Sequence, residues 1–343
     1  MPRDLTSLPT DLPVWAAPMA GGAGTPALVA AAARVGGLGF LAGGYKTPAD
    51  LVAQIARVRA TGVVFGVNLF APNPVPVAPD AYRTYARVLQ READRYHLTL
   101  PAEDVTEDDD AWAEKLALLL KAPVPLVSFT FGLPHPDTVR ALQSVGSLVA
   151  QTVTTPAEAL AAAETGADLL IVQSAAAGGH SATLTPARPL APTPLPDLVS
   201  DVRHAVPLPV IAAGGIATPA GAAAALNAGA HAVMVGTVLL RTHESGASAP
   251  YKAALADPAF TDTTLTRAFT GRPARALRNR FTDTYETVAP LGYPAVHHLT
   301  SPLRKAATAA NDTELIHLWA GTGHRRARAE PAADTLTRLA TGG

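Results

Sequence analysis

The chain has 343 residues, 48% of them hydrophobic, and a positive mean hydropathy, so it is long and apolar enough to bury a large α/β core. Its formal net charge is −1 and its basic residues do not cluster through the body of the sequence, which argues against a nucleic-acid partner. Cysteine is absent, which excludes disulfides, thiolate nucleophiles, iron–sulfur clusters and most structural zinc sites.

The sequence also argues against a membrane partner. The start, MPRDLTSLPTDLPVW, has no uninterrupted apolar core after a basic end. No window approaches the roughly 18 uncharged apolar residues that a membrane-spanning helix needs. We therefore expect a cytoplasmic protein.

From Val14 onward, short apolar runs alternate with alanine-rich stretches, a pattern typical of a parallel sheet with helical crossovers. Four of the intervening helices, at 26–35, 48–60, 156–165 and 219–228, open with Thr-Pro, which favours a helix start because threonine caps free N–H groups and proline suits the first position. Eight runs in order predict a closed (β/α)8 TIM barrel rather than an open doubly wound sheet. The runs cover residues 14–20, 38–42, 63–69, 126–131, 148–153, 169–173, 209–213 and 232–236.

Two regions fall outside this repeat. Residues 72–125 form an insertion after the third strand, with a proline-rich start, a predicted helix at 81–96, an acidic run at 103–110 and a helix at 112–121. The insertion either roofs the barrel mouth or is a solvated excursion. After Leu240 no further strand is evident, so we expect a barrel over 1–240 and a helical region over 241–343 packed beside it, fraying after His324.

The sixth run leads to a histidine. Residues 169–172 are typical of a strand buried on both faces, and Gly178 and Gly179 permit positive φ and close approach to a flat ligand. His180 would then lie at the carboxyl end of a strand, where it can act as a base or donate a hydrogen bond to an anion. Alone, the same pattern also fits a helix cap or a solvated loop.

Glycines also end the seventh and eighth predicted strands. Gly214 and Gly215 follow the seventh strand, and Gly236 and Thr237 follow the eighth. In a TIM barrel these two loops commonly form a phosphate site, because free N–H groups there face the anion. Either motif alone fits a tight turn, but together they indicate a phosphate-bearing ligand.

The ends of the first, third and sixth strands favour a flavin ring. A flat ring across the barrel top needs small residues beneath its face and amide donors at its polar edge, which Met19 with its small neighbours, Asn68 and Gln173 offer. Each also has a simpler role, as core filler or as a partner for nearby backbone. No Gly-x-Gly-x-x-Gly follows an amino-terminal strand, so we expect FMN rather than FAD.

These motifs, taken together, resemble the nitronate monooxygenase family, formerly called 2-nitropropane dioxygenases. The likeness extends over roughly residues 14–323 and includes the later phrases YPAVHHLTSPLR and LWAGTG. It implies an FMN enzyme built on a TIM barrel. The phrases that carry it are APMAGG at 17–22, GVNLF at 66–70, QSAAAGGH at 173–180, AAGGIA at 212–217, MVGT at 234–237 and AFTGRPARALRN at 268–279.

The resemblance also implies residue roles and a reaction. An alkyl nitronate would reduce the flavin, and oxygen would then oxidise the substrate to a carbonyl compound with loss of nitrite. His180 matches the family's active-site histidine, which either deprotonates a neutral nitroalkane or binds the nitro group. The protein would act as a monomer or homodimer. The implied FMN contacts are Met19, Asn68, Gln173, Gly178, Gly179, Gly214, Gly215, Gly236 and Thr237.

The chain departs from the family pattern beside the histidine. The family usually reads Gln-Gly-x-Glu-Ala-Gly-Gly-His, whereas this chain has Ser174 for the glycine and Ala176 for the glutamate. Ser181 stands where arginine is common. Without the neighbouring carboxylate, His180 should be less basic and less constrained. Two alternatives stay open: an FMN-dependent NAD(P)H enoyl-thioester reductase, which would use the same barrel and FMN site, and a diverged flavin-binding barrel, which the missing glutamate favours.

Other polar residues are weaker candidates. Tyr293 would face the flavin from the carboxyl-terminal region, and Lys46 and His135 would lie at the barrel rim, although surface or capping roles suit all three. The adjacent pair His297-His298 points to different sides and has no third ligand at a suitable spacing, so we expect no metal.

Overall fold

The computed structural model describes residue 8 and residues 10–341; residues 1–7, part of the stretch considered above for targeting signals, lie outside this range, as do residues 9, 342 and 343. Within it, eight parallel strands close into a barrel, with β9 pairing back onto β1. The predicted (β/α)8 barrel is confirmed. In barrel order the strands are β1 (Val14–Ala16), β2 (Gly39–Ala42), β3 (Phe65–Ala71), β4 (Leu126–Phe131), β5 (Leu148–Val153), β6 (Leu169–Gln173), β8 (Val210–Ala213) and β9 (Ala232–Val235).

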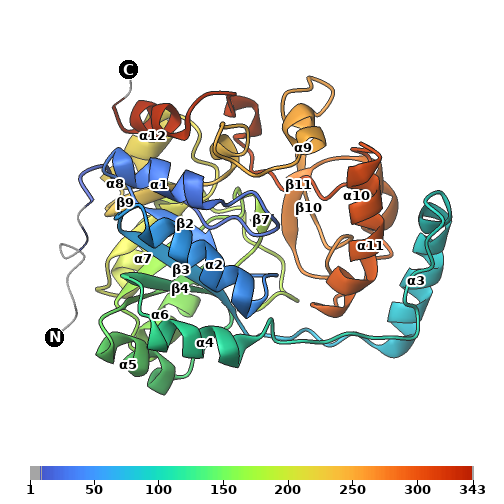
Figure 1. The fold of residues 1–343 in the computed structure, drawn as a ribbon, viewed down its shortest axis with the longest axis horizontal. Helices are drawn as coiled ribbons and strands as arrows, with labels where there is room; N and C mark the ends of the chain where they lie inside the picture. Colours follow the sequence, from blue (N-terminus) through green and yellow to red (C-terminus); the bar gives the residue numbers. More distant parts are fainter. Residues whose placement is uncertain (1–7, 9, 342–343) are drawn as a thin grey trace.

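Helices surround the barrel (Figure 1), and their Thr-Pro starts behave as predicted. The threonines before α1, α2, α6 and α8 each accept a hydrogen bond from the N–H three residues later, which satisfies one free donor of the first turn. None of the described helices is long and apolar enough to cross a bilayer. The outer helices are α1 (Pro26–Arg34), α2 (Pro48–Arg59), α4 (Trp112–Lys121), α5 (Pro136–Ser144), α6 (Pro156–Glu164), α7 (Leu195–Ala205), α8 (Pro219–Asn227) and α12 (Ala332–Thr341).

The last helix, α12, belongs to this outer layer. It packs against β1, α1 and α8, and buries Ala332, Leu336 and Leu339 in the cluster that also holds residues of β1 and β9. This spacing of four and three residues gives a helix one apolar face. The expectation that the chain frays after His324 is therefore wrong for residues up to 341.

Only the first part of the predicted insertion leaves the barrel. Although we grouped residues 112–121 with the insertion, this helix is α4, which packs against β3, α2 and α5. By contrast, α3 (Pro79–Asp94) lies far from the barrel and beside α11 (Ala295–Ala309), as Figure 1 shows. Tyr85 and Leu89 of α3 share a hydrophobic cluster with Phe269 and Phe281. The segment 72–111 and residues 241–331, with α9 (Ala249–Ala254) and α10 (Arg280–Tyr285), are called the roof below.

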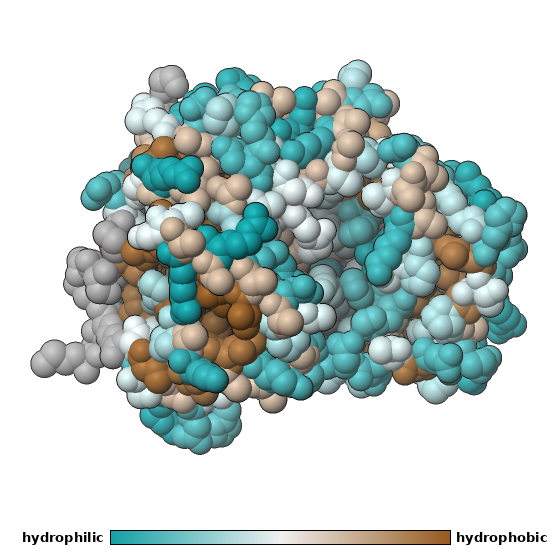
Figure 2. Space-filling view, viewed as in Figure 1, coloured by the Kyte–Doolittle hydropathy of each residue, from teal (hydrophilic) through white to brown (hydrophobic). Residues whose placement is uncertain are grey.

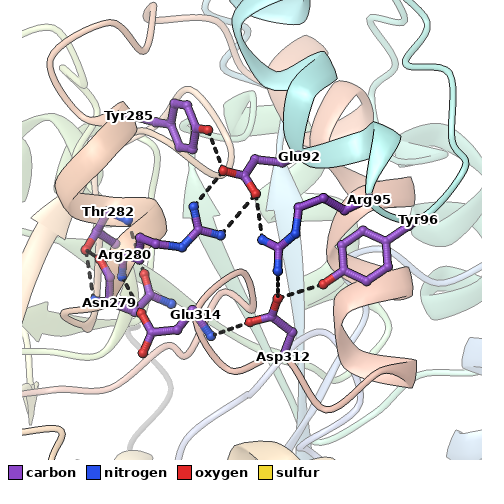
Figure 3. A network of polar contacts seen from close by, with 9 residues as sticks. All are labelled: Glu92, Arg95, Tyr96, Asn279, Arg280, Thr282, Tyr285, Asp312 and Glu314. Carbon is purple, nitrogen blue, oxygen red and sulfur yellow. Dashed lines mark hydrogen bonds and ion pairs between the residues drawn. The ribbon is translucent and has the colours of Figure 1, made fainter.

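Glu92, on the buried face of α3, fixes this helix to the rest of the roof (Figure 3). Its carboxylate accepts hydrogen bonds from Arg280 at 2.6 and 3.0 Å, from Tyr285 Oη at 2.8 Å and from Arg95 at 2.9 Å. The Arg280 contact is the main reason that the pKa of Glu92 falls to about 2. A fully partnered, ionised carboxylate therefore joins two parts of the chain that are 188 residues apart.

The roof contains strands that the sequence did not reveal. β10 (Thr263–Thr266) pairs antiparallel with β11 (Ala274–Leu277), and β11 pairs with the short β7 (Gly179–His180), which follows the barrel strand β6. The expectation of no strand after Leu240 was wrong, because these strands are short and lack an apolar run. Their register sets Ala274 opposite His180, so the loop that leaves the barrel becomes part of the roof's sheet.

Candidate active site

A cavity of about 1300 Å³ lies where the carboxyl ends of the barrel strands face the roof. Figure 2 shows this hollow between the two halves of the molecule. The carboxyl ends of barrel strands meet at one face, so residues far apart in the sequence converge there. All ten residues singled out from the sequence line the cavity: Met19, Asn68, Gln173, Gly178, Gly179, His180, Gly214, Gly215, Gly236 and Thr237.

One wall of the cavity is built mainly from backbone. Gly214 has a φ of +108°, and a Cβ there would lie 2.6 Å from Ser174 Oγ. A Cβ at Gly178 would lie 2.5 Å from the backbone N of Gly321. Gly236 differs, because the nearest atoms to an added Cβ would be at 3.6 Å, an ordinary contact distance. Such a wall lets amide groups approach an anion closely.

A roof segment that we did not assign to the site completes this wall. Gly321 N donates to Thr237 Oγ1 at 3.0 Å, and Thr322 N donates to the carbonyl of Ala176 at 3.1 Å. Gly321 and Gly323 line the cavity. The signal was present in the sequence as the glycine pair of LWAGTG, which we used only for the resemblance.

The two carboxamides in the cavity play different parts. Asn68 Oδ1 accepts from Ser128 Oγ at 2.8 Å and Thr130 Oγ1 at 3.0 Å, and its Nδ2 group has no partner among the described residues. Gln173 is occupied, since Nε2 donates to the carbonyl of His180 at 3.3 Å and Oε1 accepts from Ala182 N at 2.8 Å. Gln173 thus holds the loop that carries His180, whereas Asn68 keeps a donor for a ligand.

His180 sits in an aromatic enclosure. Its ring centroid lies 5.6 Å from Phe131, 5.7 Å from Tyr293 and 5.3 Å from Trp319. Its Nε2 lies 2.9 Å from Thr270 Oγ1, and its Nδ1 has no protein partner in the described range. Burial, followed by the charges of two arginines, lowers the pKa of His180 to about 3. The imidazole is therefore neutral at physiological pH.

The roof side of the cavity carries further polar residues. The ring of His297 stacks on Tyr45 at 4.1 Å, and Tyr293 Oη donates to Tyr45 Oη at 3.1 Å. Tyr293 and Lys46, both weaker candidates from the sequence, line the cavity. His135 does not; it is exposed and caps α5 by accepting from the N–H of Asp137.

The acidic run of the insertion lines the cavity mouth, and two of its carboxylates are paired. Asp110 accepts a hydrogen bond from Tyr45 N at 2.9 Å and forms an ion pair with buried Lys115 at 2.7 Å. Asp108 lies 2.9 Å from His298 Nε2. Across the described ranges, no group of three or more His, Cys, Asp or Glu side chains is arranged to hold a metal ion.

The closed barrel and the backbone-lined cavity at the carboxyl ends of its strands are typical of TIM-barrel enzymes. A sequence profile of the nitronate monooxygenase family matches residues 4–341. A probable nitronate monooxygenase of Staphylococcus aureus (strain Newman) is 34% identical over 337 residues, covering 97% of this chain and 94% of that protein.

Two solved structures are similar over nearly the whole chain. Nitroalkane oxidase from Streptomyces ansochromogenes is 48% identical with a TM-score of 0.92, covering 98% of this chain and 96% of that one. FabK from Thermotoga maritima is 26% identical with a TM-score of 0.75, covering 97% and 93%. The chain belongs to the nitronate monooxygenase family and is a flavoenzyme of that type. This confirms the resemblance.

Proposed function

We propose that this protein oxidises small alkyl nitronates with oxygen, giving a carbonyl compound and nitrite, and that its cofactor is FMN. The observation that carries the proposal is the neutral His180 in an aromatic chamber beside the backbone-lined wall. The similar proteins named nitronate monooxygenase and nitroalkane oxidase support the same reaction class.

The cavity residues fit FMN. Gly214, Gly215, Gly236 and Thr237 would hold the phosphate, and the unpartnered amide of Asn68 would donate to the polar edge of the ring. When bound, FMN supplies the electron-accepting chemistry, while the protein supplies position and charge.

The substrate would enter already ionised. A general base works best when its pKa lies near the working pH, so a histidine with a pKa of about 3 is a poor base for a neutral nitroalkane. A nitronate has already lost that proton. The absence of a carboxylate at Ala176, where the family usually has glutamate, is consistent with this choice of substrate.

Thr270 would determine which ring nitrogen of His180 carries the proton, and so whether His180 can donate a hydrogen bond to the substrate. Thr270 Oγ1 has two acceptors within reach, His180 Nε2 at 2.9 Å and the carbonyl of Arg272 at 3.3 Å. We propose that it donates to the nearer one, Nε2, which leaves the histidine proton on Nδ1, where it can be donated to a nitronate oxygen. We therefore assign His180 as a hydrogen-bond donor to the nitro group, the second of the two roles that the sequence left open.

Anaerobic reduction of the flavin-loaded protein tests the proposal. Ethylnitronate should bleach the flavin absorbance at about 450 nm, a property of the cofactor, while NADH and NADPH should not. Bleaching by NADH or NADPH alone would favour the enoyl-thioester reductase alternative. Bound flavin that neither reductant bleaches would favour a diverged barrel.

A further inference from the structure

We propose that Arg304 forms an anion-binding subsite in the cavity and selects the ionised substrate, the nitronate, over the neutral nitroalkane. The identity of the substrate rests on the proposed function. The subsite itself rests on the contacts of Arg304.

Arg304, on α11, is a buried cation that lines the cavity. Only 5% of the residue is exposed. Its Nε donates to Thr300 Oγ1 at 3.0 Å, and its Nη2 donates to the carbonyl of His297 at 2.9 Å and lies 3.2 Å from His297 Nδ1. These contacts aim the guanidinium, but every partner is uncharged.

Arg304 has no counter-ion among the described residues, because no carboxylate lies within 4 Å of its guanidinium. Four carboxylates, those of residues 107–110, also line the cavity; of these, Asp110 pairs with Lys115 and Asp108 contacts His298. Its Nη1 has no acceptor in the described protein and is not sealed from the cavity. A buried, unpaired guanidinium is costly, and an anion in the cavity would remove that cost.

A second buried arginine shows the contrast. Arg272 donates to the carbonyls of Asn73 and Thr183 and packs over the Phe131 ring at 4.1 Å, and it does not line the cavity. Its contacts tie roof and barrel loops together. Arg304 alone of the two presents a free donor to the chamber.

Arg304 is linked to His180 through the side chains of Tyr293 and His297. The His180 ring is 5.7 Å from that of Tyr293, and the Tyr293 ring is 6.4 Å from that of His297, which Arg304 contacts. After burial, the charge of Arg304 is among the causes that lower the pKa values of His180, His297 and His317. The positive charge of Arg304, which disfavours protonation of these histidines, also stabilises an anion in the cavity. An anionic nitronate would in addition accept a stronger hydrogen bond from Arg304 than a neutral nitroalkane would.

Arg304→Met tests the subsite, with Lys305→Met as the matched control. Methionine keeps the aliphatic stem and removes the charge, and Lys305 is the next residue, also at the cavity but exposed. Arg304→Met should raise KM for ethylnitronate by about tenfold or more and leave KM for nitroethane within about twofold. Lys305→Met should change neither by more than about twofold. If the two variants raised KM for ethylnitronate equally, the effect would come from the overall positive charge near the cavity, and the subsite would be overturned.

Binding of nitrite, measured by calorimetry on the flavin-loaded protein, reports the subsite without turnover. Arg304→Met should weaken its Kd by about tenfold, and Arg304→Lys by several-fold, because lysine restores the charge but not the planar fork. An unchanged nitrite Kd in Arg304→Met overturns the subsite. If that variant does not fold, Arg304→Lys decides in the same way.

The two proposals fail separately. Arg304-dependent nitrite binding in a protein that does not oxidise ethylnitronate would overturn the proposed function and leave the anion subsite standing. If the protein oxidises ethylnitronate and Arg304→Met changes neither KM nor the nitrite Kd, the proposed function would stand and the anion subsite would be overturned.

Discussion

The barrel and the roof differ in how far apart in the sequence their contacting elements lie. In the barrel, neighbouring strands such as β4 and β5 are joined by one short crossover, and their apolar side chains pack into shared clusters. In the roof, α3 meets α10 through Glu92 and Arg280, which are 188 residues apart. Both halves have apolar clusters, but those of the roof join segments far apart in the sequence, such as Tyr85 and Phe269. Local sequence patterns therefore determine the barrel, while long-range contacts, apolar and polar, determine the roof.

The two halves also divide the chemistry. The barrel contributes most of the wall of glycine backbone, which Gly321 of the roof completes, and the roof contributes the side chains of Tyr293, His297 and Arg304. Substitutions on the barrel side should therefore weaken cofactor binding, and substitutions in the roof should lower stability or substrate discrimination.

The largest effect is expected on the barrel side, from Gly236→Asp. The position has room for a Cβ, so the fold should persist, but a carboxylate would repel the phosphate from the wall. Flavin retained after desalting should fall by at least about tenfold. Gly236→Ala, which adds only the methyl, should keep its flavin; full retention in the aspartate variant would place the phosphate elsewhere.

The roof should lose stability in Glu92→Gln. Because the carboxylate is 3% exposed and contacts two arginines, its loss should lower the free energy of unfolding by about 3 kcal/mol, measured with urea. Glu103→Gln, whose exposed side chain lies 3.7 Å from Arg83, should cost less than about 0.5 kcal/mol. Equal losses would show that the buried contacts of Glu92 do not hold the roof.

The stabilisation by Glu92 should depend on pH, with a sign that follows from its lowered pKa. The pKa of Glu92 is lowered from 4.5 to about 2 on folding, so its stabilisation is complete well above pH 4.5 and is lost as the pH falls towards 2. The difference in unfolding free energy between wild type and Glu92→Gln should narrow over that window. A constant difference would exclude a charge effect.

At the junction of the two halves, His180→Asn should reduce kcat/KM for ethylnitronate and nitroethane by similar factors, about tenfold, because a donor to the nitro group serves both substrates. A loss of about 10² or more for nitroethane with little change for the nitronate would instead identify His180 as a base. Activity unchanged for both, with flavin still bound, would remove His180 from the mechanism.

The smallest effect is expected from Thr270→Val, which removes the partner of His180 Nε2. We expect a several-fold loss of kcat/KM for ethylnitronate and a shift in the tautomer populations of His180 seen by ¹⁵N NMR. Thr270→Ser should restore both. A serine variant as slow as the valine variant would point to lost packing instead of a lost hydrogen bond.

Sequence patterns were sufficient for most of the barrel. The predicted runs 126–131, 148–153 and 169–173 coincide with β4, β5 and β6, because each is a continuous apolar run with clear ends. The ten predicted site residues converge because parallel barrel strands end at one face.

The roof was harder to predict because its strands and site residues depend on contacts between segments far apart in the sequence. Thr263–Thr266 and Ala274–Leu277 become strands by pairing with each other and with β7, not through apolar runs of their own. Arg304 ends the phrase YPAVHHLTSPLR, which we used only for the resemblance, and its importance follows from the three-dimensional fact that no carboxylate of the described residues lies within 4 Å of its guanidinium. The contact of Thr270 with His180 depends on the same docking.

The pairing of β7 with β11 limits how this enzyme can be recombined. Side chains alternate between the two faces of a strand, so a slip of one residue in β11 against Gly179–His180 would turn every β11 side chain to the opposite face of the sheet. It would also shift Thr270, which precedes β11, relative to His180. A chimera that takes residues 241–331 from a relative would need to preserve this register even if every cavity side chain were retained. Specificity grafts would therefore be safer as point changes on α11, which lines the chamber without pairing with the histidine's strand.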